Sequence, residues 1–345
     1  MSNIEELLAQ GIRLPWAEQE KHFTVVLEDY NTVEAPKIEE SLIAELYNRR
    51  GIARRTLGNY DGSVNDYQLA LAITTDPNQR ALARINLADV HRMGFKDFSQ
   101  AHASLDEALT FIDNGTLIHA QAVDQRGLIF QAEGNYETAL ACYRRAISIC
   151  EELLNLDLPK ENDDLQRSLR SSSALEAMDR LVQAYQHQGE AAFDLYRKNK
   201  EVSPLRLAIE SEEKVMELST KSQQPNSMNT LYKARQRLGL ISFESGEVQK
   251  ALGDQFSALD YAGLIGSQKD IGISSLYVAE CLFSLGRSQE AVPHLKRFQD
   301  SVVDGIIPRQ DYFILKPKVK NTMDLIQRAG LSLFGFAEVA KRFGN

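Results

Sequence analysis

The residues best suited to metal or acid–base chemistry are scattered along the sequence. Six histidines and three cysteines never recur at the short spacing that metal ligands share, so no metal or other cofactor is expected. Acidic runs such as Glu210 to Glu213 are usually solvated helix faces rather than catalytic pairs. The sequence also lacks a phosphate-binding loop, an HExxH helix, a GxSxG elbow and an EF-hand loop. We therefore expect a protein that is not an enzyme.

The overall composition is that of an acidic globular protein. The chain has 345 residues, and 39 Lys and Arg against 48 Asp and Glu give a net charge of −9. No global positive field exists to hold nucleic acid or an anionic membrane, so we expect neither as a partner. The sequence has no apolar run of membrane-spanning length and no signal segment, and its odd number of cysteines fits a reducing compartment. A cytoplasmic location is expected.

A recurring phrase divides most of the chain into helical segments. Gly58-Asn59-Tyr60-Asp61 and Gly134-Asn135-Tyr136-Glu137 are each preceded seven residues earlier by a glycine, Gly51 or Gly127. Good helix formers dominate between such turns and β-branched runs are scarce, so helix is favoured throughout. We expect each phrase to end one helix and begin another. Weaker copies of the phrase lie at Met93-Gly94, Gly189-Glu190-Ala191, Gly246-Glu247-Val248 and Gly286-Arg287-Ser288.

Small or apolar residues recur seven positions before each turn and again in the helix that follows it. Two residues seven apart lie on the same helix face, and small side chains there let two helices approach closely. Each unit is thus predicted to be a pair of packed antiparallel helices. The positions before the turns, which we call anchors, are Gly51, Ala88, Gly127, Val182, Gly239 and Ala279.

At these residues the sequence resembles the tetratricopeptide repeat family. The resemblance is strongest in the third copy, where seven positions follow the family's pattern without a gap: Gly127, Phe130, Gly134, Tyr136, Ala139, Tyr143 and Ala146. It implies an all-α fold, a right-handed α-α superhelix of about six repeats over residues 41–300. Because stacked repeats need terminal caps, degenerate capping helices are expected over 1–40 and further capping helices over 301–345.

The period of the repeats is longer than the family's usual value of about 34 residues. Successive anchors are separated by 37, 39, 55, 57 and 40 residues, and the two long intervals flank the fourth copy. An insertion is therefore expected around 159–204, with a linker over 159–173 and an extra helical turn or two over 191–200. Ser203-Pro204 is expected to begin the next helix, since Ser is a good cap and Pro suits the first helical position.

Both ends of the chain have helical periodicity outside the repeats. At the amino-terminal end we expect helices over 4–12 and 15–31, with Trp16, Phe23 and Val26 covering the open apolar face of the first copy. At the carboxy-terminal end we expect helices over 319–328 and 331–343. The last of these is apolar, and it either caps the solenoid or docks a partner or the protein's own groove.

In the tetratricopeptide family the first helix of each repeat lines an inner groove, and the resemblance implies which side chains face it. Amides can pair with both the N–H and the C=O of an extended backbone, and arginine can hold a carboxylate through two parallel bonds. The first four copies thus suit a peptide that is acidic or has a free carboxyl end. The last two copies present apolar anchors, among them Leu240, Leu276 and Phe283. The implied groove residues are Asn48, Arg49, Arg55, Asn86, Asp89, Arg92, Gln125, Asp179, Arg180, Gln183, Arg237, Phe243 and Tyr277.

Two functions compete on these observations. The first is a non-enzymatic interaction scaffold that binds a protein segment or extended peptide in the concave groove. The second is a peptide-sensing regulator that resembles bacterial pheromone receptors but lacks their DNA-binding domain, since no basic recognition helix precedes the first copy. A third reading of the groove itself is that its polar groups pair only with one another across a solvated surface.

Overall fold

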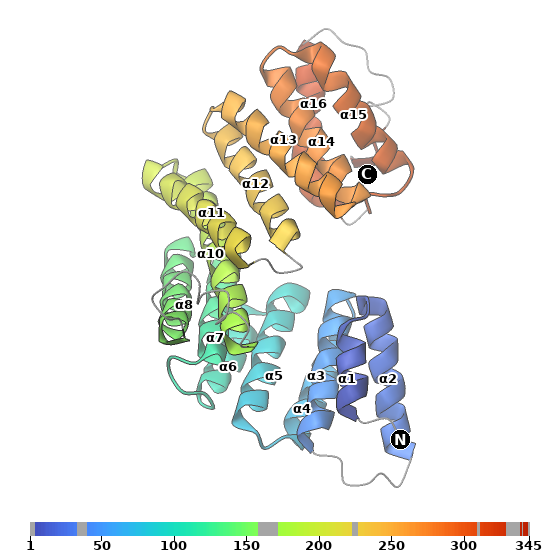
Figure 1. Ribbon diagram of the computed structural model, residues 1–345, viewed down its shortest axis with the longest axis vertical. Helices are drawn as coiled ribbons and strands as arrows, with labels where there is room; N and C mark the ends of the chain where they lie inside the picture. The colour runs from blue at the N-terminus through green and yellow to red at the C-terminus, as the bar shows by residue number, and fades with distance from the viewer. Residues whose placement is uncertain are drawn as a thin grey trace. The chain divides into compact units, whose positions relative to one another are not determined.

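The structure is a computed structural model of the chain, and it describes residues 4–32, 40–157, 172–222, 227–308, 311–328, 339 and 341–343. Within these ranges the elements are helices, and no strand is present (Figure 1). The predicted all-α class is therefore confirmed. None of the helices in these ranges is long and apolar enough to cross a membrane. The helices form two compact units, residues 1–191 and 192–345, which we describe separately.

The first unit consists of helix pairs stacked along the chain. Within it α3 packs on α4, α5 on α6 and α7 on α8, and each pair corresponds to one predicted repeat. Its helices are α1 (Ile4–Ile12), α2 (Trp16–Thr32), α3 (Glu40–Thr56), α4 (Tyr60–Ile73), α5 (Pro77–Val90), the π-helix η1 (His91–Phe95), α6 (Phe98–Leu109), α7 (Leu117–Ala132), α8 (Tyr136–Asp157) and most of α10 (Ser172–Asn199).

Local sequence chemistry explains where these helices begin. The side chain of Asn59 accepts a hydrogen bond from the Gly62 N–H at the start of α4. Asp76 caps α5 in the same way and is followed by Pro77, whose missing N–H costs nothing in the first turn. Thr116 accepts from the His119 N–H at the start of α7. These caps fix where each of the three helices begins.

Anchor glycines allow the two helices of a repeat to touch. A Cβ atom at Gly51 would lie 2.6 Å from Cε1 of Tyr67, and one at Gly127 would lie 2.5 Å from Cε1 of Tyr143. Both tyrosines are fully buried. Each aromatic ring of the second helix therefore lies directly against the backbone of the first, where any side chain would displace it.

The predicted turns are confirmed in four copies and differ in two. Gly58, Gly134, Gly246 and Gly286 have φ between 75° and 88°, a conformation that favours glycine. In the second copy the extra turn residue is taken up by η1, and the left-handed residue that follows is Lys96, with φ 56°.

The turn predicted at Gly189 in the fourth copy is wrong. Helix α10 runs without a break from Ser172 to Asn199, and it ends where Lys200 adopts a φ of 62°. A glycine inside a helix is tolerated at modest cost, and Ala191 and Ala192, both fully buried, continue the helix after it. The predicted extra turns over 191–200 are thus part of the same helix. The predicted linker over 159–173 lies outside the described residues except for its last two, which begin α10.

The amino-terminal helices cover the first repeat as predicted, with one exception. Phe23 is fully buried and Val26 nearly so, in a cluster with Ile43 and Leu46 of α3. Trp16, which was expected to join them, is 45% exposed. It is the first residue of α2, and at that end of the helix the neighbouring repeat does not reach its ring.

The second unit continues the pattern of helix pairs, with α12 packed on α13 and α14 on α15. Its core combines Leu276 and Val278 of α14 with Phe298 of α15. Its helices after the end of α10 are α11 (Val202–Ser222), α12 (Ser227–Glu244), α13 (Val248–Ile265), α14 (Gln268–Ser284), α15 (Ser288–Val303) and α16 (Tyr312–Arg328). Most of the helix predicted over 331–343 lies outside the described residues.

Two segments close the second unit. Val339 and Phe343 are buried in the same cluster as Phe298, and the rings of Phe298 and Phe343 lie 6.0 Å apart. These two residues therefore pack against the last helix pair, and most of the remaining segment predicted as a cap lies outside the described residues. Helix α16 instead packs against α14, with Leu315 and Val319 in the core.

Candidate functional site

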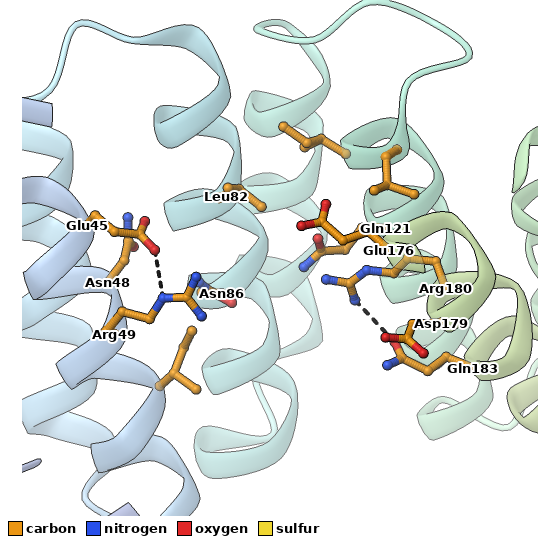
Figure 2. Close-up of a pocket in the computed structure, with 13 residues that line it drawn as sticks. Glu45, Asn48, Arg49, Leu82, Asn86, Gln121, Glu176, Asp179, Arg180 and Gln183 are labelled. Atoms are coloured by element: carbon orange, nitrogen blue, oxygen red, sulfur yellow. Dashed lines mark hydrogen bonds and ion pairs between the residues drawn. The ribbon is translucent and has the colours of Figure 1, made fainter. Parts of the chain in front are cut away.

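Side chains from four helices of the first unit surround a hollow of about 440 Å³. Three of these helices, α3, α5 and α7, are the first members of the three helix pairs described above, and the fourth is α10. The hollow is open to solvent and mixes polar with apolar side chains (Figure 2). Among the predicted groove residues, those that line it are Asn48, Arg49, Asn86, Asp179, Arg180 and Gln183.

Two arginines face one another across this hollow. The guanidinium groups of Arg49, on α3, and Arg180, on α10, both point into it from opposite walls (Figure 2). Arg49 donates through Nε to Glu45 Oε1 at 2.6 Å, and Arg180 donates through Nη1 to Gln183 Oε1 at 3.2 Å. Burial lowers the pKa of Arg180, so its charge is poorly solvated by its surroundings. The arrangement presents two guanidinium groups from opposite sides of one small volume, which Glu45, Glu176 and Asp179 also line.

Asn48 adds an unusual amide at the wall of the hollow. Its side chain is only 3% exposed, yet neither its Nδ2 nor its Oδ1 has a hydrogen-bond partner. Buried polar groups are nearly always paired, because an unpaired one costs about 1–3 kcal/mol. Asn48 can donate and accept at once, as an extended backbone requires.

The hollow extends one helical turn further than the predicted groove positions. Glu45, Leu82, Gln121 and Glu176 also line it, and each lies six residues before an anchor. That position is four residues before the predicted one at Arg49, Asn86 or Arg180, so it shares their helix face. Continuing the helical period by one turn would have found all four from the sequence. Ile52 of α3 and Leu117 and Ile118, at the start of α7, complete the lining.

Four other predicted groove residues form a closed network around Asp89. Arg55 and Arg92 both pair with its carboxylate, and Gln125 donates to Asp89 Oδ1 at 2.7 Å. Burial opposes the charged form, but the two guanidinium groups outweigh it and hold the pKa of Asp89 below its ordinary value. These residues join α3, α5, η1 and α7, and the two guanidinium groups share the single carboxylate of Asp89. Of the arginines predicted to face the groove, Arg55 and Arg92 therefore belong to this network, whereas Arg49 and Arg180 line the hollow.

The remaining predicted residues lie in the second unit. Arg237 of α12 pairs with the buried Glu212 of α11 at 3.4 Å, so its guanidinium group contacts the preceding helix. Phe243 and Tyr277 line a separate cavity of about 620 Å³, and Leu240 lies beside them. Burial raises the pKa of Tyr277 to about 12, so its hydroxyl stays protonated at neutral pH.

Two apolar residues predicted for the groove lie in the core instead. Leu276 is fully buried and Phe283 is 7% exposed, both in the cluster with Phe298. The prediction assumed that the inner face of α14 is open. Helix α16 covers that face, so side chains of α14 are buried on every side.

Comparison with known proteins agrees with this architecture. A family model for the tetratricopeptide repeat matches residues 120–153, the third copy. No curated protein sequence matches the chain.

Solved structures resemble the fold over most of its length. A Rap protein complexed with competence and sporulation factor is 12% identical, with a TM-score of 0.51 over 98% of this chain and 99% of that one. Aspartyl phosphate phosphatase F from Bacillus subtilis is 13% identical, with a TM-score of 0.50 over 95% and 84%. BtubC from P. vanneervenii is 15% identical, with a TM-score of 0.50 over 77% and 93%. Residues 120–153 therefore form a tetratricopeptide repeat, and the chain has the fold of a tetratricopeptide-like helical solenoid.

Proposed function

We propose that the protein is a non-catalytic interaction scaffold whose first unit binds an extended peptide in the hollow between α3, α5, α7 and α10. The observation that carries this proposal is the pair Arg49 and Arg180, which point into one volume from opposite walls (Figure 2). Arginine matches a carboxylate through its planar fork, so the chemistry that fits between them is an acidic side chain or a free carboxyl end.

The existing bonds of the two arginines support this assignment. Arg49 uses Nε on Glu45 and Arg180 uses Nη1 on Gln183, while a guanidinium group has five N–H donors. A carboxylate placed between them can therefore bind both without breaking either bond. Because burial already limits the solvation of Arg180, its pairing with an anion loses less hydration than at an open surface.

Amide and apolar side chains around the arginines fit a peptide backbone rather than a small anion. Asn48 has both halves of its amide unpaired, and Asn86 and Gln121 lie on the neighbouring helices. Leu82 and Ile118 supply apolar surface between them. Glu45, Glu176 and Asp179 share the lining, so free inorganic anions gain little there.

The test is selection of peptides from a library. A positional library of fluorescent octapeptides is made in two forms, one with a free carboxyl end and one amidated, and binding is measured by anisotropy at low and physiological salt. We expect selected peptides to be acidic or to need the free carboxyl end, and to bind more weakly as salt rises. Arg180→Gln and Arg49→Gln should each weaken binding by about tenfold to a hundredfold, from 1.5–3 kcal/mol per charge-assisted bond.

Arg84→Gln is the matched control. Arg84 is also in the first unit, on α5, but it pairs with Glu107 of α6 outside the hollow. Its replacement should leave peptide affinity unchanged within about twofold. Selection of the same peptides by the wild type and the Arg49→Gln/Arg180→Gln double variant would overturn the proposal.

A peptide-responsive regulator is the second candidate. The observation that favours it is the match over almost all of both chains to a Rap protein whose structure contains competence and sporulation factor. The same library separates the two candidates. A regulator should show changes in hydrogen exchange far from the hollow when a selected peptide binds, whereas a scaffold should show protection only at the helices that line it.

A further inference from the structure

A buried carboxylate on the inner face of the second unit depends on one lysine. Glu280 of α14 is only 1% exposed, and its Oε2 pairs with Nζ of Lys318 at 3.2 Å. Asn321, one turn further along α16, donates to its Oε1. A charge this deeply buried is strongly destabilising unless it is paired, so the site requires a cation.

Aromatic rings complete the surroundings of the lysine. The ammonium group of Lys318 lies 4.9 Å from the centre of the Phe243 ring and 5.8 Å from that of Tyr277. Aromatic faces attract cations at these distances. Phe243, Tyr277 and Glu280 thus form a cage for a positive side chain, which we call the cation cage.

The cation cage lies where the groove of this unit was predicted. Phe243 and Tyr277 are both positions that the family register assigns to the inner surface, and they come from the first helices of two successive pairs. Helix α16 therefore packs on the inner face of α14, as a bound segment would, while Phe343 packs beside Phe298.

Several features of α16 and its surroundings favour its release from α14. Pro317 lies inside it and removes one main-chain hydrogen bond, which lowers the stability of the isolated helix. The cavity of about 620 Å³ beside Lys318 remains open between α12, α14 and α16. On its rim Arg197 and Glu244 bind each other at 2.7 Å. Space for another segment thus exists next to the resident one.

We propose that the cation cage is a binding site for a basic segment of a partner protein, and that α16 occupies it as an internal ligand. Glu280 decides the chemistry of the partner. Any segment that displaces α16 removes Lys318 and Asn321, so it must bring a lysine or arginine side chain of its own. An acidic or wholly apolar segment would leave the buried carboxylate unpaired. This site involves neither Arg49 nor Arg180, so its test is independent of the peptide site in the first unit.

The test uses the full chain and a synthetic peptide with the sequence of residues 311–328. Lys318→Glu places two carboxylates together and should release α16, so exchange of its amides should rise by at least about tenfold. The labelled peptide should then bind the Lys318→Glu chain at least about tenfold more tightly than the wild type, whose site is filled. Lys320→Glu, an exposed position on the same helix, is the matched control and should change neither measurement.

Two further comparisons identify the cage as the place of binding. A peptide that carries Lys318→Met should bind the Lys318→Glu chain at least about tenfold more weakly, and a peptide that carries Lys320→Met should bind as the parent does. Phe243→Leu, added to the Lys318→Glu chain, should weaken binding of the parent peptide by about threefold, because the aromatic ring is lost. Unchanged exchange in α16, or equal binding of the parent peptide and its Lys318→Met version, would overturn the proposal.

Discussion

Gly127→Ala tests whether close approach of two helices at an anchor determines the stability of a repeat. The new Cβ atom would lie 2.5 Å from Cε1, 2.8 Å from Cδ1 and 2.9 Å from Cζ of Tyr143. The ring has little room to move, because it is fully buried and its hydroxyl donates to Gln131 Oε1 at 2.8 Å. Overpacking of this kind costs about 1–3 kcal/mol.

Helix propensity acts in the opposite direction and must be subtracted. Alanine is more favourable than glycine inside a helix by about 0.5–1 kcal/mol. At the middle of these ranges the net loss in the free energy of unfolding should therefore be about 1 kcal/mol, and Gly127→Leu should lose more. Native-state hydrogen exchange of α7 and α8 is the suitable assay, since it reports this pair separately from the rest of the chain.

Two controls separate packing from propensity. Gly253, inside α13, has nothing within 4 Å of its Cβ position, so Gly253→Ala should stabilise its helix by about 0.5–1 kcal/mol. In a Tyr143→Leu background the ring is gone, and Gly127→Ala should then cost little or nothing. Equal stability of Gly127→Ala and the wild type would show that helix approach at the anchor does not limit this repeat.

Three further predictions concern buried charges and thiols. Asp66 is fully buried between Arg50 and Arg54, so Asp66→Asn should lower the free energy of unfolding by about 3–5 kcal/mol in urea, while the exposed Asp61→Asn should not. The pKa of Asp89 is lowered in the folded state, so its ionised form stabilises the fold above about pH 4 and this contribution is lost as pH falls through the folded pKa. The difference in Tm between the wild type and Asp89→Asn should thus close below about pH 4, and a difference constant with pH would contradict the network. Burial raises the pKa of Cys150 and Cys281 to about 12, so iodoacetamide at about pH 8 should modify the more exposed Cys142 first, and mass spectrometry gives the order.

The sequence was sufficient for the architecture of the regular repeats because one pattern determines both turn and packing. Gly134 permits the left-handed turn, and Gly127 permits the approach of Tyr143. The two glycines are seven residues apart, as the family pattern requires. In the fourth copy the same reasoning failed. Gly189 has no such partner in the pattern, and a helix can run through a lone glycine when buried alanines follow it.

Partners of charged groups could not be predicted from the sequence. The family register placed Arg49, Arg55 and Arg92 on one surface, but it does not say which carboxylate each side chain reaches. That choice depends on the facing helix, since Asp89 of α5 receives Arg55 from α3. Docking of α16 on α14 is equally long-range, because nothing in the local pattern of α14 distinguishes a face covered by a later helix from an open one.

The arginines of the first unit have different roles, and the position of the carboxylate that each one reaches decides which role it has. Arg50 donates through both Nε and Nη2 to the fully buried Asp66, so its fork is engaged in holding α3 to α4. Arg55 and Arg92 share Asp89, whose charge they offset together. Arg49 differs because its carboxylate, Glu45, lies one turn back on the same helix and binds Nε alone.

The geometry at Arg49 leaves the two terminal nitrogens of its fork directed into the hollow (Figure 2). A bond within one helix holds the side chain in place without consuming its bidentate face, which is the face that recognises a carboxylate. Preorganisation of this kind reduces the side-chain entropy lost on binding, so a positioned arginine binds a carboxylate more tightly than a mobile one. Glu45→Gln should therefore weaken a carboxylate ligand even though it removes a competing negative charge, and tighter binding by that variant would show that Glu45 repels the ligand rather than positions Arg49.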